Sequence, residues 1–404
     1  MTFPLSRHFR LRNVDSHKSH QRRGTCEEPV FGVKGTSPLN HLLSLPVHVP
    51  YDVMHLVYLG MAKRLLQIVV DKRLVDLKTL SKYIDGIKVP HSFRRRPKNL
   101  IEELSLWKSQ EHKIFLLYFA PLCFSLQFLS SSRTDDVTQI ALLYLCLSSS
   151  IYVLTAEYVD TETLESVSEI LYFFQTLLKT SFGPGVCTGT LHSLIHLPRQ
   201  VENFGGLSAT SAMCFENVNR FLKRSVSGKK RQGLQIAERF LCMKQTCQDS
   251  GQTKEKLATK STSAQNLLLS QLSLSSGDVT FFDKVCSNVV LHSYDFGKNL
   301  RSASYFAFVK DKSVFVKIKC IFKTGEAIKC FCRTYTTSCC WHDMFTNVPP
   351  FLKRHLLRAC RHFNLRKGDM EVFDAKRLTN YAIVHKISSS AYYAVRILSD
   401  HDHE

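Results

Sequence analysis

The period of the hydrophobic pattern changes along this chain, and this change limits the possible folds more than any other feature. Up to about residue 247 the apolar residues recur at three- and four-residue steps, which is typical of helices. From Val279 the apolar residues alternate with polar ones, which is typical of strands. Residues 248–278 are rich in Ser, Thr and Gln, and we interpret them as a linker with at most one weak helix. The sequence therefore predicts an α+β protein that ends in a small β-rich, barrel-like domain at 279–404.

The charge balance indicates a polyanionic partner. The chain of 404 residues has 54 Lys and Arg against 34 Asp and Glu, a formal net charge of +20. Such an excess favours nucleic acid or an anionic membrane surface. The 14 cysteines lack the spacing of a disulfide framework, and the N-terminus lacks the apolar segment of a secretory signal. We therefore expect reduced thiols in the cytosol or nucleus.

Two apolar stretches, 114–129 and 140–154, raise the alternative of a membrane protein. Pro121 and Gln127 interrupt the first, and three serines at 148–150 interrupt the second. Both are shorter than the roughly 20 residues that a spanning helix needs. We interpret them as buried helices and expect no membrane partner, with the membrane protein as a remote alternative.

The N-terminal part contains one candidate site. Residues 1–30 are polar and basic, and we expect a disordered arm there. After Pro50, Asp52 is placed as the N-cap of a helix with His55 at its third position. Either Asp52 is only a cap, or Asp52 and His55 converge where free N–H groups and the helix dipole would let a neutral His55 contact a phosphate.

A second candidate site lies between Cys187 and Phe240. After a Gly205-Gly206 break, a helix begins around Ser211, with Glu216 off its apolar stripe. Every charged residue that follows, up to Arg231, is basic: Arg220, Lys223, Arg224, Lys229, Lys230 and Arg231. This order suits a metal-binding carboxylate beside a phosphodiester backbone. Alternatively, Glu216 and Arg220 form an ordinary helical ion pair and the basic run is a solvated face.

Two further clusters have open interpretations. The loop KVPHSFRRRPKN gathers four basic residues, which would meet DNA backbone or form a solvated turn. These residues are Arg94, Arg95, Arg96 and Lys98. His192 and His196 have the spacing of metal ligands, but no Glu follows His192 as the metalloprotease signature requires. We therefore expect packed, hydrogen-bonded histidines there.

The order of the motifs is more specific than any one of them. In sequence they are GVKGTSPL, PYDVMHLVYLGMAKRLL, RRRP, LWKSQEHKIFLLYFAPL, LHSLIHLPRQVENFGGL and FENVNRFLKRSVSGKK. This series resembles the C-terminal half of a CACTA (En/Spm)-type DNA transposase over residues 30–245. The β-rich region that follows is similar to the tail of those proteins.

The resemblance implies an RNase H-like core whose two Asp and one Glu bind Mg²⁺ or Mn²⁺. A helical insertion, here about 61–179, splits that core before the Glu. By resemblance Glu216 is that Glu, and Asp52 and His55 match the family's Asp-x-x-His motif. These three residues should then lie close together. In the family both Asp precede the Asp-x-x-His motif, whereas Asp15 is the sole Asp before Asp52 in this chain.

Further departures surround the histidines. Thr190 stands where the family has Asn, and Gly206 and Ser208 stand where it has Pro and Trp. These changes indicate a decayed or divergent copy. Because the two upstream Asp are missing, we expect an N-terminally truncated protein with an incomplete RNase H-like core at 31–247. In it Glu216, Asp52 and His55 would be vestigial, and Glu216 would bind metal only if other residues completed the core. No cofactor is expected for this chain.

These expectations favour a transposase-derived, DNA-binding protein of the nucleus that does not cleave DNA strands. An alternative is a domesticated, non-enzymatic host protein that binds DNA or protein. The expected partners are DNA and either a second copy of the chain or a complete transposase subunit.

Overall fold

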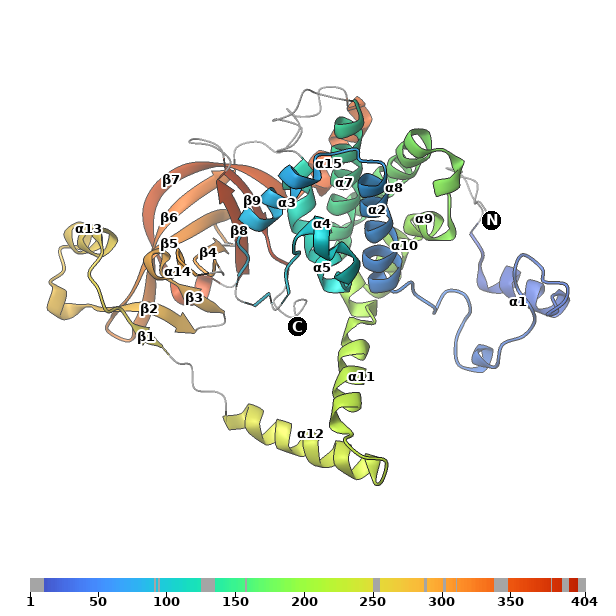
Figure 1. Ribbon diagram of the computed structural model, residues 1–404, viewed down its shortest axis with the longest axis horizontal. Helices are drawn as coiled ribbons and strands as arrows, with labels where there is room; N and C mark the ends of the chain where they lie inside the picture. Colours follow the sequence, from blue (N-terminus) through green and yellow to red (C-terminus); the bar gives the residue numbers. More distant parts are fainter. Residues whose placement is uncertain are drawn as a thin grey trace.

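The computed structural model describes most of the chain, and it has an α+β fold (Figure 1). The described residues are 11–90, 92–93, 95–124, 135–156, 158–249, 255–286, 289–300, 303–309, 311–337, 348–378, 380–386 and 392–398. A helical body adjoins a β-sheet unit, and a helical arm projects from the body (Figure 1).

The helical body is built on α7 and α8, which pack against each other. Its α-helices are α2 (Lys63–Asp71), α3 (Leu77–Gly86), α4 (Leu100–Glu103), α5 (Ser109–Ile114), α7 (Asp135–Leu154), α8 (Thr161–Phe182), α9 (Gly189–Ser193) and α10 (Leu197–Phe204). Two π-helical segments, η2 (Met54–Ala62) and η4 (Phe115–Phe119), lead into α2 and continue α5. Short 3₁₀ turns are η1 (Pro38–His41), η3 (Leu104–Leu106), η5 (Pro184–Val186), η6 (Leu194–His196) and η7 (Leu207–Thr210).

Helix α7 accounts for one of the two apolar stretches. Residues Asp136–Leu154 have the length and hydropathy of a membrane span, but 89% of the most apolar window is buried inside the protein. The hydrophobic effect of this burial explains the composition of the helix without a bilayer. Of the other stretch, residues 114–124 are helical and buried, and the rest lies outside the described residues.

The expectation of a disordered N-terminal arm is wrong for residues 11–30. Helix α1 (Val14–Arg23) begins with a capping box, in which the backbone N–H of Ser16 donates to Oδ1 of Asn13 at 2.8 Å. The Asn13 N–H donates in return to the Ser16 hydroxyl at 3.0 Å. Such reciprocal capping satisfies two N–H groups that a helix start leaves without partners.

The β-sheet unit contains nine described strands, and all their pairings are antiparallel. They are β1 (Lys256–Leu257), β2 (Thr280–Cys286), β3 (Val290–His292), β4 (Phe306–Val309), β5 (Val314–Thr324), β6 (Ala327–Thr337), β7 (His362–Asp374), β8 (Asn380–Lys386) and β9 (Tyr392–Arg396). The order β5-β4-β8-β9-β7-β6 closes on itself because β6 also pairs with β5. The sheet therefore forms a six-stranded ring, which we call the barrel. Strand β2 extends the sheet from β5, with β1 and β3 paired to it.

Most of the expected linker belongs to the sheet unit. Strand β1 pairs with β2, and α13 (Ser263–Leu272) packs on β5. Leu268 of α13 is fully buried in a cluster with Val279, Phe322 and Phe331. The sequence allowed one weak helix in this segment, and α13 is such a helix, held in place by burial of Leu268 and by a Thr262–Gln265 capping box. The boundary between the two regions therefore falls near residue 250.

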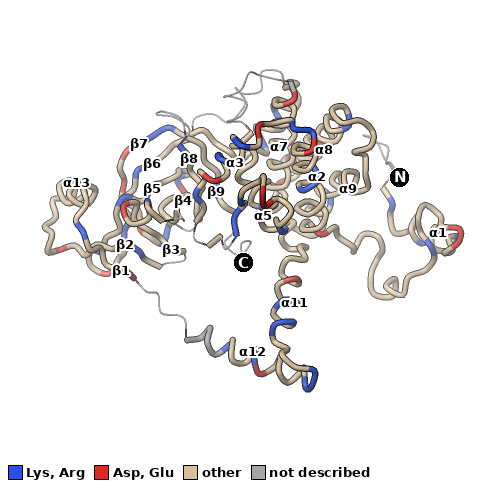
Figure 2. The backbone as a smooth tube through the Cα atoms, in the orientation of Figure 1, with Lys and Arg blue, Asp and Glu red and all other residues tan. Residues whose placement is uncertain are grey.

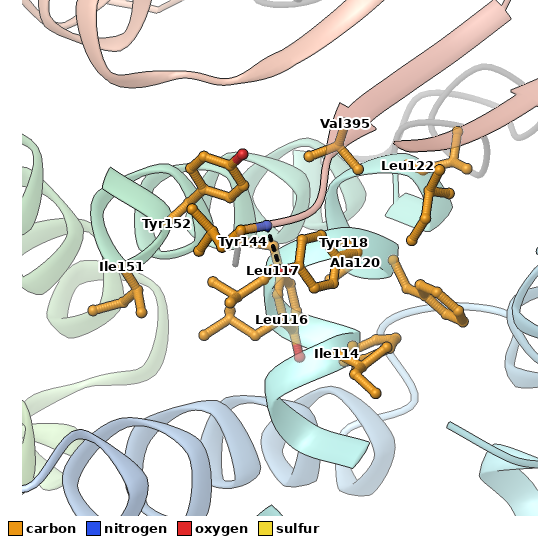
Figure 3. Close-up of a cluster of buried hydrophobic side chains, with 14 of the residues drawn as sticks. Ile114, Leu116, Leu117, Tyr118, Ala120, Leu122, Tyr144, Ile151, Tyr152 and Val395 are labelled. Carbon is orange, nitrogen blue, oxygen red and sulfur yellow. Dashed lines mark hydrogen bonds between the residues drawn. The ribbon is translucent and has the colours of Figure 1, made fainter. Parts of the chain in front are cut away.

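The body and the barrel share one hydrophobic core. Helix α15 (Pro350–Ala359), which lies between β6 and β7 in sequence, packs on α7 and α8. Val395 of β9 lies beside Tyr118, Leu117 and Tyr152 from the body (Figure 3). The expected sequence of two folded regions is present, but a continuous core joins them.

A buried hydrogen-bond relay crosses this core. The Tyr393 hydroxyl donates to the carbonyl of Tyr118 at 2.9 Å, so it accepts from Nδ1 of His362 at 2.7 Å. Nε2 of His362 then accepts from the Ser148 hydroxyl at 3.2 Å. Burial lowers the pKa of His362 to about 3, so the ring stays neutral and both nitrogens are satisfied.

In the described part of 31–247, the regular elements are helices, and extended pairing is limited to isolated bridge residues at Val33, which pairs with Val30, and at Val89. The RNase H-like core that the resemblance implies stays a prediction.

Candidate functional site

One amide side chain brings the two candidate sites together. Gln200 on α10 accepts from the backbone N–H of Tyr51 at 2.7 Å and donates to the Tyr51 carbonyl at 2.8 Å. Its amide nitrogen also lies 2.9 Å from the Thr210 hydroxyl, just before the next helix. Gln200 is buried, so its amide must find such partners. It fixes the segment before η2 against the segment before α11 (Met213–Ser225).

The carboxylate of Asp52 links the N-terminal ends of two helices. Oδ1 accepts from the N–H of Met54 at 3.1 Å and from the N–H of Ala212 at 2.8 Å. Oδ2 accepts from the N–H of His55 at 3.2 Å and contacts Nδ1 of the His55 ring. Asp52 is therefore the N-cap that the sequence predicts, and it also holds the start of α11.

The pKa of Asp52 reflects these contacts. Partial burial alone would raise the pKa of the carboxyl group. Hydrogen bonds from the Ala212 N–H and the His55 side chain outweigh that effect, so the pKa lies below its ordinary value of 3.8. The carboxylate is thus held in its ionised form.

The structure brings Asp52, His55 and Glu216 together, as the resemblance implies. Nε2 of His55 lies 3.9 Å from Oε1 of Glu216, while Nδ1 faces Asp52. The side chains of His55 and Glu216 are each 57% exposed, against 21% for Asp52. The His55 ring therefore bridges a part-buried carboxylate and an open one. Among the described residues, His55 is the basic side chain within 4 Å of Glu216, and Arg220 does not form the expected ion pair with it.

This donor set does not fit a pair of divalent metal ions. Both oxygens of Asp52 already accept hydrogen bonds from N–H groups, and metal ligation would break those bonds. Of the two carboxylates at this site, Glu216 is then the one that is open to a ligand. Among the described residues, no group of three or more His, Cys, Asp or Glu is arranged to hold a metal ion.

His192 and His196 pack together near this site. Their Nε2 atoms lie 3.4 Å apart, and the His196 ring stacks on Tyr51 with centroids 6.0 Å apart. Burial, and next the neighbouring His192, lower the pKa of His196 to about 4. Burial also lowers the pKa of His192. This geometry agrees with packed, neutral histidines.

From this root, α11 and α12 (Gln232–Asp249) form a projecting arm (Figure 1). The two helices are held together by an edge contact between Phe221 and Phe240, with centroids 6.4 Å apart. Arg239 donates to the carbonyl of Arg224 at 2.6 Å, and Gln235 donates to the carbonyl of Lys230 at 2.7 Å. We call residues 213–249 the arm.

The predicted basic run lies on the arm and at its bend (Figure 2). All six residues are exposed: Arg220, Lys223, Arg224, Lys229, Lys230 and Arg231. Within the described part of the chain, none of them forms an ion pair with a carboxylate. Their charges are therefore available to an external anion.

The basic loop at 94–98 is arranged differently. Arg95 lies 3.4 Å from Glu111, Arg96 lies 3.8 Å from Asp85, and Lys98 lies 3.1 Å from Glu103. Arg94 lies outside the described residues. The three described cations are thus already paired, which favours the interpretation as a structural turn.

Sequence reasoning missed another basic group, on the strands of the barrel. It contains Lys317, Lys319, Arg333, Lys367 and Lys386. The available signal was the Lys-Ile-Lys alternation at 317–319, because alternate residues of a strand face the same side.

Comparison of the chain with protein-family models, with curated proteins and with solved structures gives no match.

Proposed function

We propose that this chain is a transposase-derived, nuclear protein that binds duplex DNA through its arm and does not cut the strands by itself. The observation that carries the proposal is the arm itself, whose exposed basic residues have no carboxylate partner among the described residues. In this proposal the helices between Lys63 and Phe182 derive from the insertion of an RNase H-like core.

The physical basis is the release of counterions from DNA. Each Lys or Arg that neutralises a phosphate adds about 0.9 to the slope of log affinity against log salt. A cation that is already paired within the protein must first give up its carboxylate, which reduces the gain. The arm has no such cost among its described contacts, whereas the loop at 95–98 does.

We base the lack of cleavage on the two Asp that the resemblance places before the Asp-x-x-His motif, of which residues 1–51 contain at most Asp15, and on the state of Asp52, which does not replace them. Two-metal cleavage needs carboxylate oxygens that are free to bind the ions. The oxygens of Asp52 instead cap η2 and the start of α11. We therefore assign Asp52 and His55 to the anchoring of the arm, and Glu216 to the exposed end of that contact.

A second candidate is protein binding by the same arm. Several of its apolar side chains are exposed, which favours contact with another chain. They are Phe215, Val218, Leu234, Phe240, Leu241 and Met243. Sedimentation at several protein concentrations would detect self-association.

Fluorescence anisotropy with a labelled duplex tests the first candidate. We expect the combined variant Lys229→Ala, Lys230→Ala and Arg231→Ala to lower the salt slope by about 2 to 3. The matched control removes three paired charges, in Arg95→Ala, Arg96→Ala and Lys98→Ala. The control should leave the slope within about 1 of the wild type.

Equal loss in both variants would show that the overall charge, not the arm, attracts DNA. An unchanged slope in the arm variant would disprove the proposed function.

A further inference from the structure

The barrel has an open cavity of about 600 Å³ at one end. Each of the six strands in the ring contributes at least one residue to its lining. In chain order these residues are Phe306 on β4, Lys317 and Lys319 on β5, Arg333 and Tyr335 on β6, Lys367 on β7, Val384, His385 and Lys386 on β8, and Tyr392 on β9. Tyr294 of the short helix α14 (Tyr294–Gly297), Tyr305, and Gly86 and Lys88 beside α3 complete the rim. We call this cavity the barrel mouth.

Contacts across the ring show that these residues face inward. Tyr335 on β6 contacts Tyr392 on β9, with centroids 5.4 Å apart, although these strands are not paired. Phe315 on β5 lies 5.8 Å from Phe363 on β7 in the same way. Phe315, Leu365, Ala382 and Ala394 form a buried apolar cluster with these tyrosines. The mouth is therefore a cavity with an apolar floor, which is where ligands bind in many barrels.

The lining is strongly basic. Six of the lining residues are cations: Lys88, Lys317, Lys319, Arg333, Lys367 and Lys386. The described residues that line the mouth include no Asp or Glu. Asp295 lies nearby but pairs with Lys298 at 2.8 Å. Burial, and next the neighbouring Lys319, lower the pKa of Lys317 to about 8. A bound anion would relieve this crowding of like charges.

Aromatic rings lie among the cations. The Nζ atom of Lys317 lies 3.4 Å from the centroid of the Tyr294 ring, and that of Lys319 lies 4.8 Å from it. Nζ of Lys367 lies 5.7 Å from the centroid of Tyr392. A flat, unpaired base can stack on the partly exposed ring of Tyr294 while the cations contact its phosphates, and this combination is typical of single-strand binding.

We propose that the barrel mouth binds unpaired nucleotides of single-stranded nucleic acid. The cavity has the volume of a small-ligand site, so it admits individual nucleotides and not the width of a duplex. Acidic peptides would use the cations but would leave the aromatic rings without a stacking partner. The site is distinct from the arm and does not depend on duplex binding there.

The sheet offers a matched pair of variants for a test. The mouth variant is Lys367→Ala with Lys386→Ala, because both side chains are exposed and their loss leaves the core intact. A second mouth variant, Tyr294→Leu, removes a partly exposed aromatic ring of the rim and keeps the charge. The control is Lys323→Ala with Lys329→Ala, which removes two cations from β5 and β6 outside the mouth.

The measurement is anisotropy of a labelled 12-nucleotide thymidine strand with the full chain. We expect each mouth variant to lower single-strand affinity about tenfold or more, consistent with one stacked base or two phosphate contacts. The control and the arm variant should retain single-strand affinity within about threefold. Each mouth variant should retain duplex affinity.

Competition identifies the ligand. An excess of adenosine monophosphate or inorganic phosphate should displace the strand only weakly, and a glutamate peptide of equal length should not displace it. The proposal would be overturned if the glutamate peptide bound as tightly as the thymidine strand. It would also be overturned if the protein bound adenosine monophosphate but did not bind the strand. A loss of single-strand affinity in the arm or control variant as large as that in the mouth variants would overturn it as well. Failure of duplex binding alone would count against the arm and not against the mouth.

Discussion

The arm and the loop at 95–98 are both basic, but the cations of the loop are paired with carboxylates and those of the arm are not paired among the described residues. The loop lies against the helical body, where Asp85, Glu103 and Glu111 of neighbouring helices pair with its cations. The arm leaves the body, and its basic residues meet no carboxylate in the part of the chain that is described (Figure 2). Basic residues can therefore bind an external partner only where the fold keeps acidic side chains away from them.

The loop also contributes to stability in a way that the arm does not. Glu111 is 5% exposed and accepts from the backbone N–H of Lys108 at 3.0 Å, besides its contact with Arg95. Its carboxylate therefore needs both partners to offset the loss of water. Glu216, in contrast, is mostly solvated.

The largest expected effect comes from removing these two acids one at a time. Glu111→Ala should lower the free energy of unfolding by about 1 to 3 kcal/mol, because it leaves the Lys108 N–H without its cap. Glu216→Ala should change it by less than about 0.5 kcal/mol, since its side chain is exposed. Urea denaturation of both variants measures the difference. Equal destabilisation would mean that the arm is packed in solution.

A smaller effect is expected at the root of the arm. Asp52→Ala should cost about 1 to 2 kcal/mol, because it removes the N-cap of η2 and the bond to the Ala212 N–H. If that loss loosens α11, trypsin should cleave at Arg220 or Lys223 about 5 to 30 times faster.

The matched control is Asp76→Ala. Asp76 caps α3 through the Lys78 N–H, away from the arm. This variant should leave cleavage in the arm unchanged. If it increases that cleavage as much as Asp52→Ala, the link between Asp52 and Ala212 does not hold the arm.

The smallest effect concerns acid pH. Because the pKa of Asp52 is lower in the folded protein than its ordinary value of 3.8, its hydrogen bonds contribute fully above that value. The contribution is lost as the pH falls through the folded pKa. Tryptic cleavage needs neutral pH, so hydrogen exchange of α11 between pH 5 and pH 3 is the suitable measurement. Wild type should lose protection there, and Asp52→Asn should show a weaker dependence on pH.

Much of the local structure was predictable from the chain. Asp52 after Pro50 has the sequence of an N-cap and is one. Periodicity predicted helices before residue 247 and strands after residue 279, and both are present. The prediction of disorder failed at α1, where a local capping box stabilises a polar helix. The weak helix allowed within 248–278 exists as α13, but burial of Leu268 attaches it to the sheet unit, so most of this segment is not a linker.

Composition and residue spacing alone did not predict which residues lie together in the candidate site. Its convergence was expected only from the order of the motifs, since Asp52 and Ala212 are 160 residues apart. The basic residues of the barrel mouth were not found, because strands distant in sequence bring them together only when the ring closes.

The order of residues was enough to assign most helices and strands, because side-chain period and capping act over a few residues. The sequence also determined the excess of positive charge. Only the tertiary structure decided where that charge is available. The same lysines and arginines are neutralised in the loop, exposed on the arm and gathered around aromatic rings in the barrel mouth. The reason is that electrostatic energy depends on the distances and burial of groups from distant segments, which the linear order of residues does not specify.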